Sequence, residues 1–234
     1  MSSIESRILY EDNHLIIINK ECGELVQGDK TGDVTLAEDV KAYLKEKYNK
    51  PGNVYLGIPH RLDRPTSGIV VYTKTEKALI RLNEAFKGTA VHKTYWAVVD
   101  KAPSKSEGTL VHYVVRNAEK NKTIAYSIEK KGSKVARLDY KLLGASDKFY
   151  LLEINLHTGR HHQIRSQLAA IGLHIKGDLK YGYPRSNPDG GIHLHAREIT
   201  FMHPVKKEEI TITAPVPNDT VWKYFEKNYE ERTL

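Results

Sequence analysis

The sequence predicts an α+β fold built on a mixed, mostly antiparallel sheet with flanking helices. The first observation is a succession of strand-like segments between residues 91 and 156, in which no helical periodicity intervenes. The second is that helical periodicities are few and lack the regular strand–helix alternation of a parallel sheet. The third is the composition, 40% hydrophobic and 28% charged, which is ordinary for a folded globular chain.

The N-terminal part predicts both strands and helices. Strands are expected at residues 7–10, 14–19 and 69–72, where apolar and β-branched side chains gather. A flexible stretch rich in glycine and aspartate is expected at 22–33. Thr35-x-x-Glu38 and Thr73-x-x-Glu76 have the form of capping boxes, so a helix is expected to begin at each of them.

The remaining elements are predicted to be mainly strands. They are expected at residues 93–99, 108–115, 123–128, 136–143, 150–156, 193–201 and 208–213. A helix is expected to carry Ile164, Leu168 and Ile171 on one face and to end at Gly172. A last amphipathic helix is expected to start near Asn218.

Composition excludes several classes of protein. The 234 residues suffice for one large domain, and we expect a single domain over residues 1–234 with two lobes around one cleft. The single cysteine, Cys22, excludes an internal disulfide and a cysteine-based zinc site. No apolar run approaches the roughly 18 residues of a membrane span, and the N-terminus lacks the apolar core of a signal peptide. We therefore expect a cytoplasmic protein, with a monomer as the default state.

The chain is basic. Lys and Arg number 36 against 29 Asp and Glu, and the formal net charge is +7. Because Lys and Arg neutralise phosphates, this balance favours RNA or DNA over a membrane surface as the partner. The alternative is a solvated basic face that binds no ligand.

The densest polar segment is His60-Arg61-Leu62-Asp63-Arg64-Pro65-Thr66-Ser67-Gly68. One carboxylate lies between two guanidinium groups, in a loop that Pro65 and Gly68 restrict. Neighbouring positive charge is expected to keep Asp63 ionised, which suits a nucleophile or base better than an acid. The alternative is a surface Arg–Asp–Arg cluster that contributes little.

Two further segments carry candidate functional groups. His157-Thr158-Gly159-Arg160-His161-His162-Gln163-Ile164-Arg165 gathers hydrogen-bond donors at a strand-to-helix transition, a natural place to hold phosphate. No carboxylate accompanies its histidines at a recognised metal-ligand spacing, so polar loop histidines are favoured over a metal site. Lys93-Thr94-Tyr95 lies on a strand, where Tyr95 is either a core aromatic or a platform for base stacking.

Together these motifs resemble the RluA-type RNA pseudouridine synthases. Residues 60–68 resemble the family signature H-R-L-D-x-x-T-S-G, 93–95 its K-x-Y strand, and 158–165 its T-G-R-x-H-Q-I-R segment. Later blocks also match in order: Gly177-Asp178, Tyr181-Gly182, Leu194-His195-Ala196 and Phe201-Met202-His203-Pro204. The matches run from about residue 7 to about residue 217, and no S4-like RNA-binding domain is expected in front of them.

The resemblance implies a central basic cleft and the isomerisation of uridine to pseudouridine in ribosomal or transfer RNA, without a metal or cofactor. It implies that Asp63 is the catalytic carboxylate, that Tyr95 packs against the target base and helps to remove the C5 proton, and that Arg165 pairs with Asp63. The expected RNA-binding residues are Arg61, Arg64, Lys93, Thr158, Gly159, Arg160, His162 and Gln163, with surface lysines such as Lys176 and Lys180.

Some residues depart from the family pattern, and two other functions are weighed. His161 replaces a frequent Thr, Arg or Lys, and Gln167 replaces a frequent His, which leaves the preferred RNA open. A non-catalytic RNA-binding or RNA-folding protein is the main alternative. It is disfavoured because a pure binder gains nothing from Asp63 among phosphate-seeking arginines. A histidine-based metallohydrolase is the other, and metal analysis of the purified protein tests it.

Overall fold

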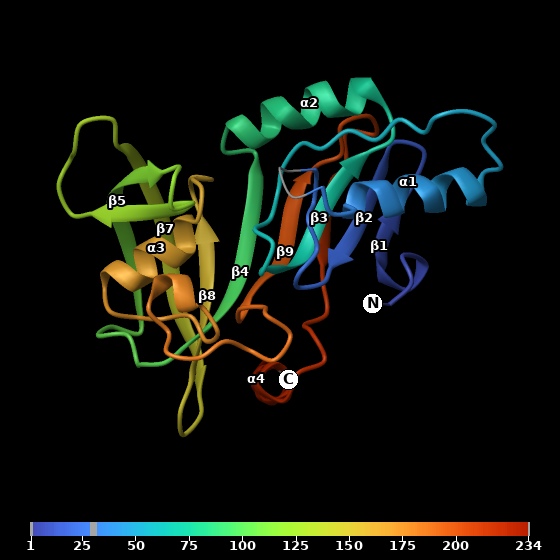
Figure 1. Ribbon diagram of the computed structural model, residues 1–234. Helices are drawn as coiled ribbons and strands as arrows, with labels where there is room; N and C mark the ends of the chain where they lie inside the picture. Colours follow the sequence, from blue (N-terminus) through green and yellow to red (C-terminus); the bar gives the residue numbers. More distant parts are fainter. Residues whose placement is uncertain (1, 29–31, 234) are drawn as a thin grey trace. The chain divides into compact units, whose positions relative to one another are not determined.

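The computed structural model describes residues 2–28 and 32–233, which form two compact units (Figure 1). Unit 1 contains Met1–His92 and Ala196–Pro215, and unit 2 contains Lys93–His195 and Val216–Leu234. Each unit therefore combines two stretches of chain that are distant in sequence. The expected cleft between two lobes of one domain stays a prediction.

Unit 1 is a sheet with two helices. Its elements are η1 (Glu5–Arg7), β1 (Ile8–Glu11), β2 (Leu15–Lys20), α1 (Leu36–Lys47), β3 (Ser67–Thr73), α2 (Glu76–Lys87), β10 (Glu209–Thr213) and all but the first two residues of β9 (Leu194–Met202). The strand order is β1-β2-β3-β9, with β10 on β9, and the β1–β2, β2–β3 and β9–β10 pairs are antiparallel. The strand β2 is central because Ile16, Ile17 and Ile18 are completely buried.

Helix α1 packs on this sheet through one apolar stripe. Leu36, Val40 and Leu44 join Ile16 and Ile18 in a single buried cluster. The helix begins at a complete capping box, as predicted, because Thr35 Oγ1 accepts the backbone N–H of Glu38 while the Glu38 carboxylate accepts that of Thr35.

The second predicted capping box is wrong. Thr73 is the last residue of β3, where it pairs with Leu15 and exchanges backbone hydrogen bonds with Gly57. The strand therefore continues past the predicted helix start, and Thr75 caps α2 by accepting the backbone N–H of Ala78. The strand pairing of Thr73, which the local sequence does not reveal, is the reason the helix begins two residues later than predicted.

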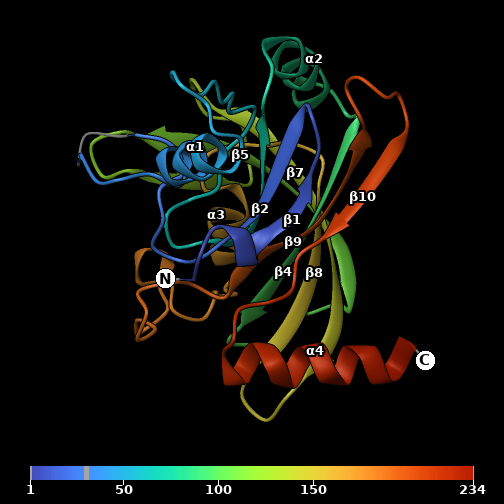
Figure 2. The ribbon, with the colours of Figure 1, turned by 90° about the vertical axis from the view of Figure 1, so that its right-hand side faces the viewer.

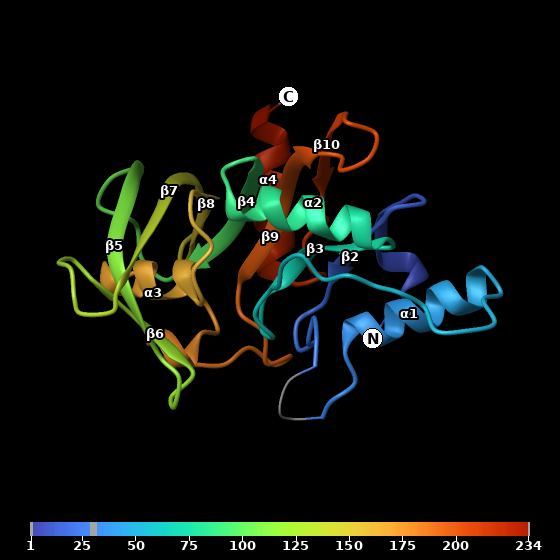
Figure 3. The same ribbon diagram turned by 90° about the horizontal axis from the view of Figure 1, so that it is seen from above.

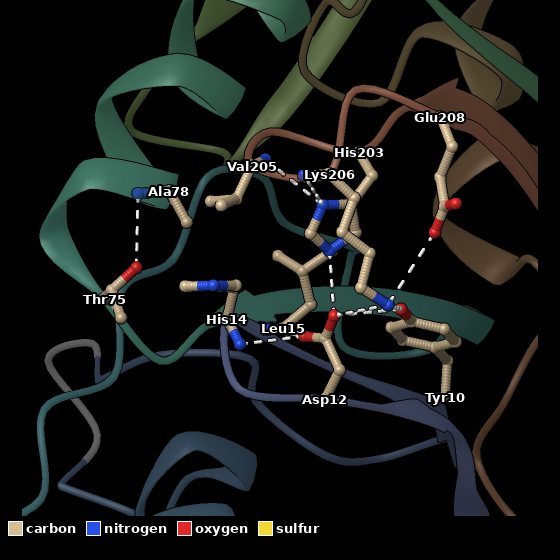
Figure 4. A network of polar contacts seen from close by, with 10 residues as sticks. All are labelled: Tyr10, Asp12, His14, Leu15, Thr75, Ala78, His203, Val205, Lys206 and Glu208. Carbon is tan, nitrogen blue, oxygen red and sulfur yellow. Dashed lines mark hydrogen bonds and ion pairs between the residues drawn. The ribbon is translucent and has the colours of Figure 1, made fainter.

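A polar network joins the β1–β2 turn to the β9–β10 hairpin within unit 1 (Figure 4). The fully buried His203 accepts two backbone N–H groups of its own turn at Nδ1, so its Nε2 carries the proton and donates to Asp12 at 3.0 Å. Tyr10 and Lys206 also contact the Asp12 carboxylate. Burial alone would raise the pKa of Asp12, but hydrogen bonds from backbone N–H groups and from Lys206 and Tyr10 hold it well below its usual value.

Unit 2 is an antiparallel sheet with a helix on each face. Its elements are all but the first two residues of β4 (Val91–Val99), then β5 (Glu107–Asn117), β6 (Lys122–Tyr126), β7 (Lys134–Ala145), β8 (Tyr150–Leu156), α3 (Gln163–Ala170), η2 (Leu179–Tyr181) and α4 (Thr220–Thr233). The strand order is β4-β8-β7-β5-β6, and each neighbouring pair is antiparallel. The predicted α+β class with a mostly antiparallel sheet is therefore confirmed.

The two helices cover opposite faces of the unit 2 sheet. Gln167 of α3 donates to the backbone carbonyls of Leu110 and Ala136 and contacts the side chain of His112. Helix α3 therefore packs on the face of the sheet to which the His112 side chain points. On the other face Trp222 and Phe225 of α4 pack with Trp96 of β4 and with Leu151 of β8 (Figure 2).

Three details differ from, or lie beyond, the sequence-based expectations. Ile171 is 41% exposed because α3 ends at Ala170, so Ile171 does not belong to its apolar face. The predicted loop at 22–33 includes residues 29–31, which lie outside the described part of the chain. Nowhere in residues 2–28 and 32–233 is there a helix with the length and apolar character that a bilayer span requires.

Candidate functional site

Asp63 lies in a loop of unit 1 just before β3, and its backbone carbonyl closes a turn by accepting the N–H of Thr66 at 3.0 Å. The side chain is half-buried. The carbonyls of Arg64 and Thr66 accept hydrogen bonds from Lys20 Nζ at 3.0 and 2.6 Å. The loop that carries the carboxylate is thus tethered to the end of β2.

Lys20 is a buried cation, with only 1% of its surface exposed. Its Nζ donates to three backbone carbonyls, those of Glu21, Arg64 and Thr66. Burial lowers its pKa to about 8, against the opposing effect of nearby acidic groups, among them Asp63. Three carbonyl dipoles therefore stabilise a charge that the protein interior otherwise disfavours, and the bonds to Arg64 and Thr66 fix the backbone on both sides of Pro65.

Both ends of residues 60–68 are fixed by tertiary packing. The His60 ring stacks on Phe86 with a centroid separation of 4.6 Å, and its Nε2 accepts the backbone N–H of Val71 at 2.9 Å. Gly68 has φ +108°, and a Cβ atom there would lie about 2.3 Å from the carbonyl oxygen of Ala196. Only glycine fits this crossing of two backbones.

The two arginines that flank Asp63 in sequence have different surroundings. The Arg64 Nε donates to the Gly23 carbonyl at 2.9 Å, and its guanidinium pairs with the half-exposed Asp33 at 2.9 Å. Arg61 is exposed and makes no hydrogen bond or ion pair with any other residue in the described part of the chain. Arg61 is therefore available to a ligand, whereas Arg64 also helps to close the loop.

Tyr95 lies on β4 in unit 2 and is 9% exposed. It pairs with Ile154, which pairs in turn with Tyr140, so these three side chains point to the same face of the sheet. Ala136 of β7 lies on this face too, and its partner in β5 is His112. Because His112 contacts Gln167, this is the face on which α3 packs. Tyr95 and α3 therefore share one face of unit 2.

The segment before α3 is folded around Gln163. Its Oε1 accepts the Thr158 hydroxyl at 2.8 Å and the Arg160 backbone N–H at 3.0 Å, while its Nε2 donates to the Arg137 carbonyl at 3.1 Å. Thr158 and Gln163 are thus engaged within the protein. A Cβ on Gly159 would lie 3.7 Å from Lys93 Nζ, so this turn passes beside the lysine, whose pKa burial lowers.

His162 caps α3 in the left-handed region, with φ 48°. The Tyr181 hydroxyl accepts the backbone N–H of Thr123 at 2.8 Å and is hydrogen-bonded to His162 Nδ1 at 2.9 Å. Burial, followed by the positive charges of Arg165, His161, Lys180 and Arg116, lowers the pKa of His162 to about 2. His162 is therefore a neutral structural residue at physiological pH.

Arg165 is 5% exposed and is held by an acidic partner that sequence reasoning missed. Its Nε and Nη2 donate to the two carboxylate oxygens of Asp178 at 2.7 and 2.9 Å, a bidentate geometry. The guanidinium carbon also lies 4.9 Å from the centroid of the Tyr181 ring. The blocks Gly177-Asp178 and Tyr181-Gly182 were the available signal, but their partner could not be read from spacing.

The candidate residues fall into two groups. Arg61, Asp63 and Arg64 belong to unit 1. Unit 2 contains Lys93, Tyr95, Thr158, Gly159, Arg160, His162, Gln163 and Arg165. Within unit 2, the structure joins Thr158, Arg160 and Gln163 directly, and joins His162 to Arg165 through Tyr181. The pairing of Arg165 with Asp63 stays a prediction.

The histidines have partners of their own. His161 stacks on His162 with centroids 3.8 Å apart and contacts the Thr123 hydroxyl, while His193 contacts Asn187 and Asp219. Across the residues that the structure describes, no group of three or more His, Cys, Asp or Glu side chains is arranged to hold a metal ion.

Comparison with known proteins identifies related chains. Residues 14–170 match the family model described as RNA pseudouridylate synthase. The chain is 36% identical over 213 residues to an uncharacterized RNA pseudouridine synthase of Synechocystis, covering 90% of this chain and 65% of that relative. It is 35% identical over 226 residues to ribosomal large subunit pseudouridine synthase D of Xylella fastidiosa, covering 91% and 66%. It is 34% identical over 218 residues to ribosomal large subunit pseudouridine synthase C of Rickettsia felis, covering 90% and 67%.

The same fold occurs in a human protein. The structure of human RNA pseudouridylate synthase domain containing 4 superimposes with a TM-score of 0.78 at 23% identity, covering 97% of this chain and 94% of the human one. At this identity the similarity establishes the fold. The chain spans about two thirds of the length of the three bacterial relatives.

Proposed function

Because the chain belongs to the RNA pseudouridylate synthase family, whose members isomerise uridine in RNA to pseudouridine, we propose that it modifies a uridine of large-subunit ribosomal RNA. Two relatives at 34–35% identity carry names of ribosomal large subunit pseudouridine synthases, which supports this substrate. Transfer RNA is the alternative substrate. An enzyme of this kind works where ribosomes are assembled, so we propose the cytoplasm as its location.

The single observation that carries the proposal is the Asp63 loop. A carboxylate flanked by arginines is held on a backbone that Lys20 tethers from within unit 1. A negative side chain in a surface that binds phosphates weakens RNA binding. A chemical role for the carboxylate explains why it is there. A pure RNA-binding protein has no use for this arrangement.

Asp63 acts at the ribose. The N1–C1′ bond breaks, the uracil rotates, a C5–C1′ bond forms, and the C5 proton leaves while N1 gains a proton. Asp63 either attacks C1′ or removes the 2′ proton, and both routes use an ionised carboxylate. Glycosidases need two carboxylates because one protonates the leaving group and the other acts on C1′ or water. An isomerisation consumes no water, so one carboxylate suffices.

Two groups of unit 2 assist. Arg165 keeps Asp63 charged and oriented during the reaction, and Asp178 in turn holds the direction of the Arg165 guanidinium. Tyr95 packs against the detached uracil while it rotates and helps to remove the C5 proton. The burial of both side chains suits groups that hold a substrate in a fixed geometry.

The remaining candidates bind the RNA. A uridine inside a stem or tight loop must leave its stack before it reacts, at a cost of a few kcal/mol. Arg61, exposed and without a protein partner in the described chain, fills the vacated space, since a guanidinium can stack and donate hydrogen bonds together. Arg64, Lys93 and Arg160 contact phosphates. Thr158, His162 and Gln163 shape the turn that presents them.

Pseudouridine mapping in total RNA tests this function. RNA from cells with and without the gene is treated chemically so that reverse transcription stops at pseudouridines. We expect one or a few stops in large-subunit ribosomal RNA to disappear with the gene. Lost stops in transfer RNA would support the alternative substrate, and an unchanged pattern would support the non-catalytic RNA-binding alternative.

A further inference from the structure

Unit 2 carries a cluster of cations beside α3 that the proposed reaction does not use. Arg116 is the penultimate residue of β5, Lys122 begins β6, and Lys180 lies in η2; we call these three side chains the hairpin cation patch. Figure 3 shows the β5–β6 hairpin beside α3, and these elements contact one another. Arg116 and Lys180 are exposed, and Lys122 is half-buried.

The patch is rigidly mounted. The Thr123 backbone N–H donates to the Tyr181 hydroxyl at 2.8 Å, and the Thr123 hydroxyl contacts His161 Nδ1 at 2.8 Å. At the hairpin end, His161 Nε2 contacts the Asn121 side chain at 3.2 Å, and Lys180 Nζ donates to the Asn121 carbonyl at 3.2 Å. These contacts fix the backbone of the hairpin beside η2, with Lys180 Nζ held at the Asn121 carbonyl and Lys122 Nζ 5.1 Å from the centroid of the Tyr181 ring. An ordered backbone reduces the entropy lost when a ligand binds.

The three cations of the patch form no ion pair with another residue in the described ranges, although the exposed Glu119 lies in the turn of the same hairpin. The nearby Asp178 is buried and already holds both oxygens toward Arg165. The low pKa of His162 follows first from burial and then from the cations around it, Arg116 and Lys180 among them. Such a concentration of like charge calls for an anionic ligand.

One member of the patch, Lys122, lies close to Arg165. Lys122 Nζ is 5.1 Å and the Arg165 guanidinium carbon 4.9 Å from the centroid of the same ring, that of Tyr181. Since both distances share one point, the two cations are no more than about 10 Å apart. A nucleic-acid strand advances about 3.4 Å per nucleotide, so 10 Å corresponds to about three nucleotides.

We infer that the hairpin cation patch binds the phosphate backbone of the RNA strand within about three nucleotides of the reacting uridine. This inference rests on the proposed function, because that function places Arg165 at the reacting uridine. The patch contacts phosphates and not bases, so it positions the RNA backbone next to the target uridine without reading the base sequence. It thereby favours uridines whose flanking backbone can reach the hairpin.

The test compares two triple variants of the full chain. Arg116→Gln, Lys122→Gln and Lys180→Gln are combined in one, and Lys101→Gln, Lys105→Gln and Lys148→Gln in the other. The control lysines are exposed side chains of unit 2 without contacts in the described chain, and each triple lowers the net charge from +7 to +4. Affinity for a large-subunit ribosomal RNA transcript is measured at several salt concentrations in an Asp63→Asn background, and thermal melting confirms that both variants are folded.

We expect the patch variant to bind about 10- to 100-fold more weakly at 0.1 M salt and its salt slope to fall by about 2 to 3, while the control stays within about 2-fold of the parent. With Asp63 restored, the patch substitutions should lower the single-turnover rate at sub-saturating RNA by a factor similar to the loss of affinity, while the control substitutions should not. Equal affinities for patch and control variants would overturn the inference and leave an acidic protein as the partner to seek. Because affinity is read without turnover, a failure of the proposed isomerisation is seen separately, as absence of pseudouridine with the unsubstituted chain.

Discussion

The segments at residues 60–68 and 157–165 carry the candidate catalytic groups Asp63 and Arg165, and they are held in different ways. The first is tethered through its backbone, since Lys20 donates to its carbonyls and Gly68 crosses the backbone of Ala196. The second is held through side chains, with Gln163 binding the turn and Asp178 binding Arg165. A backbone tether fixes where the loop runs and leaves its side chains to the substrate, whereas a side-chain network fixes the direction of a guanidinium.

The largest effect of a single substitution is expected at Gly68, in the first segment. Gly68→Ala places a methyl group about 2.3 Å from a backbone oxygen that cannot move independently, so we expect the variant not to fold. The matched control is Gly172→Ala, at a similar φ of +78° but with no atom within 4 Å of the added Cβ. The control should cost only about 1–2 kcal/mol of unfolding free energy from backbone strain. Circular dichroism and urea unfolding measure both, and similar stabilities would show that the close approach to Ala196 is unimportant.

For the second segment the largest effect is expected from substitution of Asp178, the partner of Arg165. Asp178→Asn leaves the buried Arg165 without its anionic partner, which should destabilise the protein by about 3–5 kcal/mol. Urea unfolding measures this loss. At a temperature where the variant is still folded, its turnover should also fall, because the guanidinium is no longer held in direction. A folded variant with full stability and activity would contradict the role given to this ion pair.

The buried Lys20, which tethers the first segment, should give stability a dependence on pH. In the folded protein burial lowers the pKa of Lys20 to about 8, below the ordinary lysine value of 10.5, so between these values the unfolded chain binds more protons. The contribution of Lys20 to stability therefore rises as pH increases from about 8 to 10.5, by the linkage relation. The measurement is the difference in unfolding free energy between the unsubstituted protein and Lys20→Met across this range. A difference that stays constant, or that moves the other way, would show that Lys20 keeps an ordinary pKa.

The smallest effect is expected at Thr158. Thr158→Val keeps the shape of the side chain but removes its hydrogen bonds with Gln163 and with the Arg137 backbone N–H. We expect a loss of about 1–2 kcal/mol in unfolding free energy and a modest rise in KM for RNA, with kcat nearly unchanged. A large fall in kcat would instead place Thr158 in contact with the reacting nucleotide.

Local patterns predicted much of this molecule. The strand and helix order, the Thr35–Glu38 cap and the α+β class follow from apolar periodicity and capping residues, which act over a few positions. Contacts between distant residues could not be predicted. Lys20 meets Thr66 across 46 positions, and the strand pairing of Thr73 with Leu15 moved a helix cap to Thr75.

The sequence predicted which residues belong to the candidate site, but it did not predict the residues with which they form hydrogen bonds and ion pairs. An ionisable Asp63 among arginines and a donor-rich segment before α3 stand out in the sequence. The Asp178 partner of Arg165 is 13 positions away and depends on how the chain turns after α3. Lys180 was expected among the RNA-binding lysines, but the fold was needed to show that it and Arg116 both lie near His162.

The central claim is that Asp63 performs the reaction, and product formation by Asp63→Asn tests it most directly. The purified variant is incubated with large-subunit ribosomal RNA, and pseudouridine is quantified by nucleoside analysis beside the unsubstituted protein. We expect no detectable pseudouridine from the variant, with RNA affinity within about 2-fold of the unsubstituted protein, because the amide keeps the size of the side chain but loses the charge. Pseudouridine formation at a comparable rate by Asp63→Asn would contradict the account.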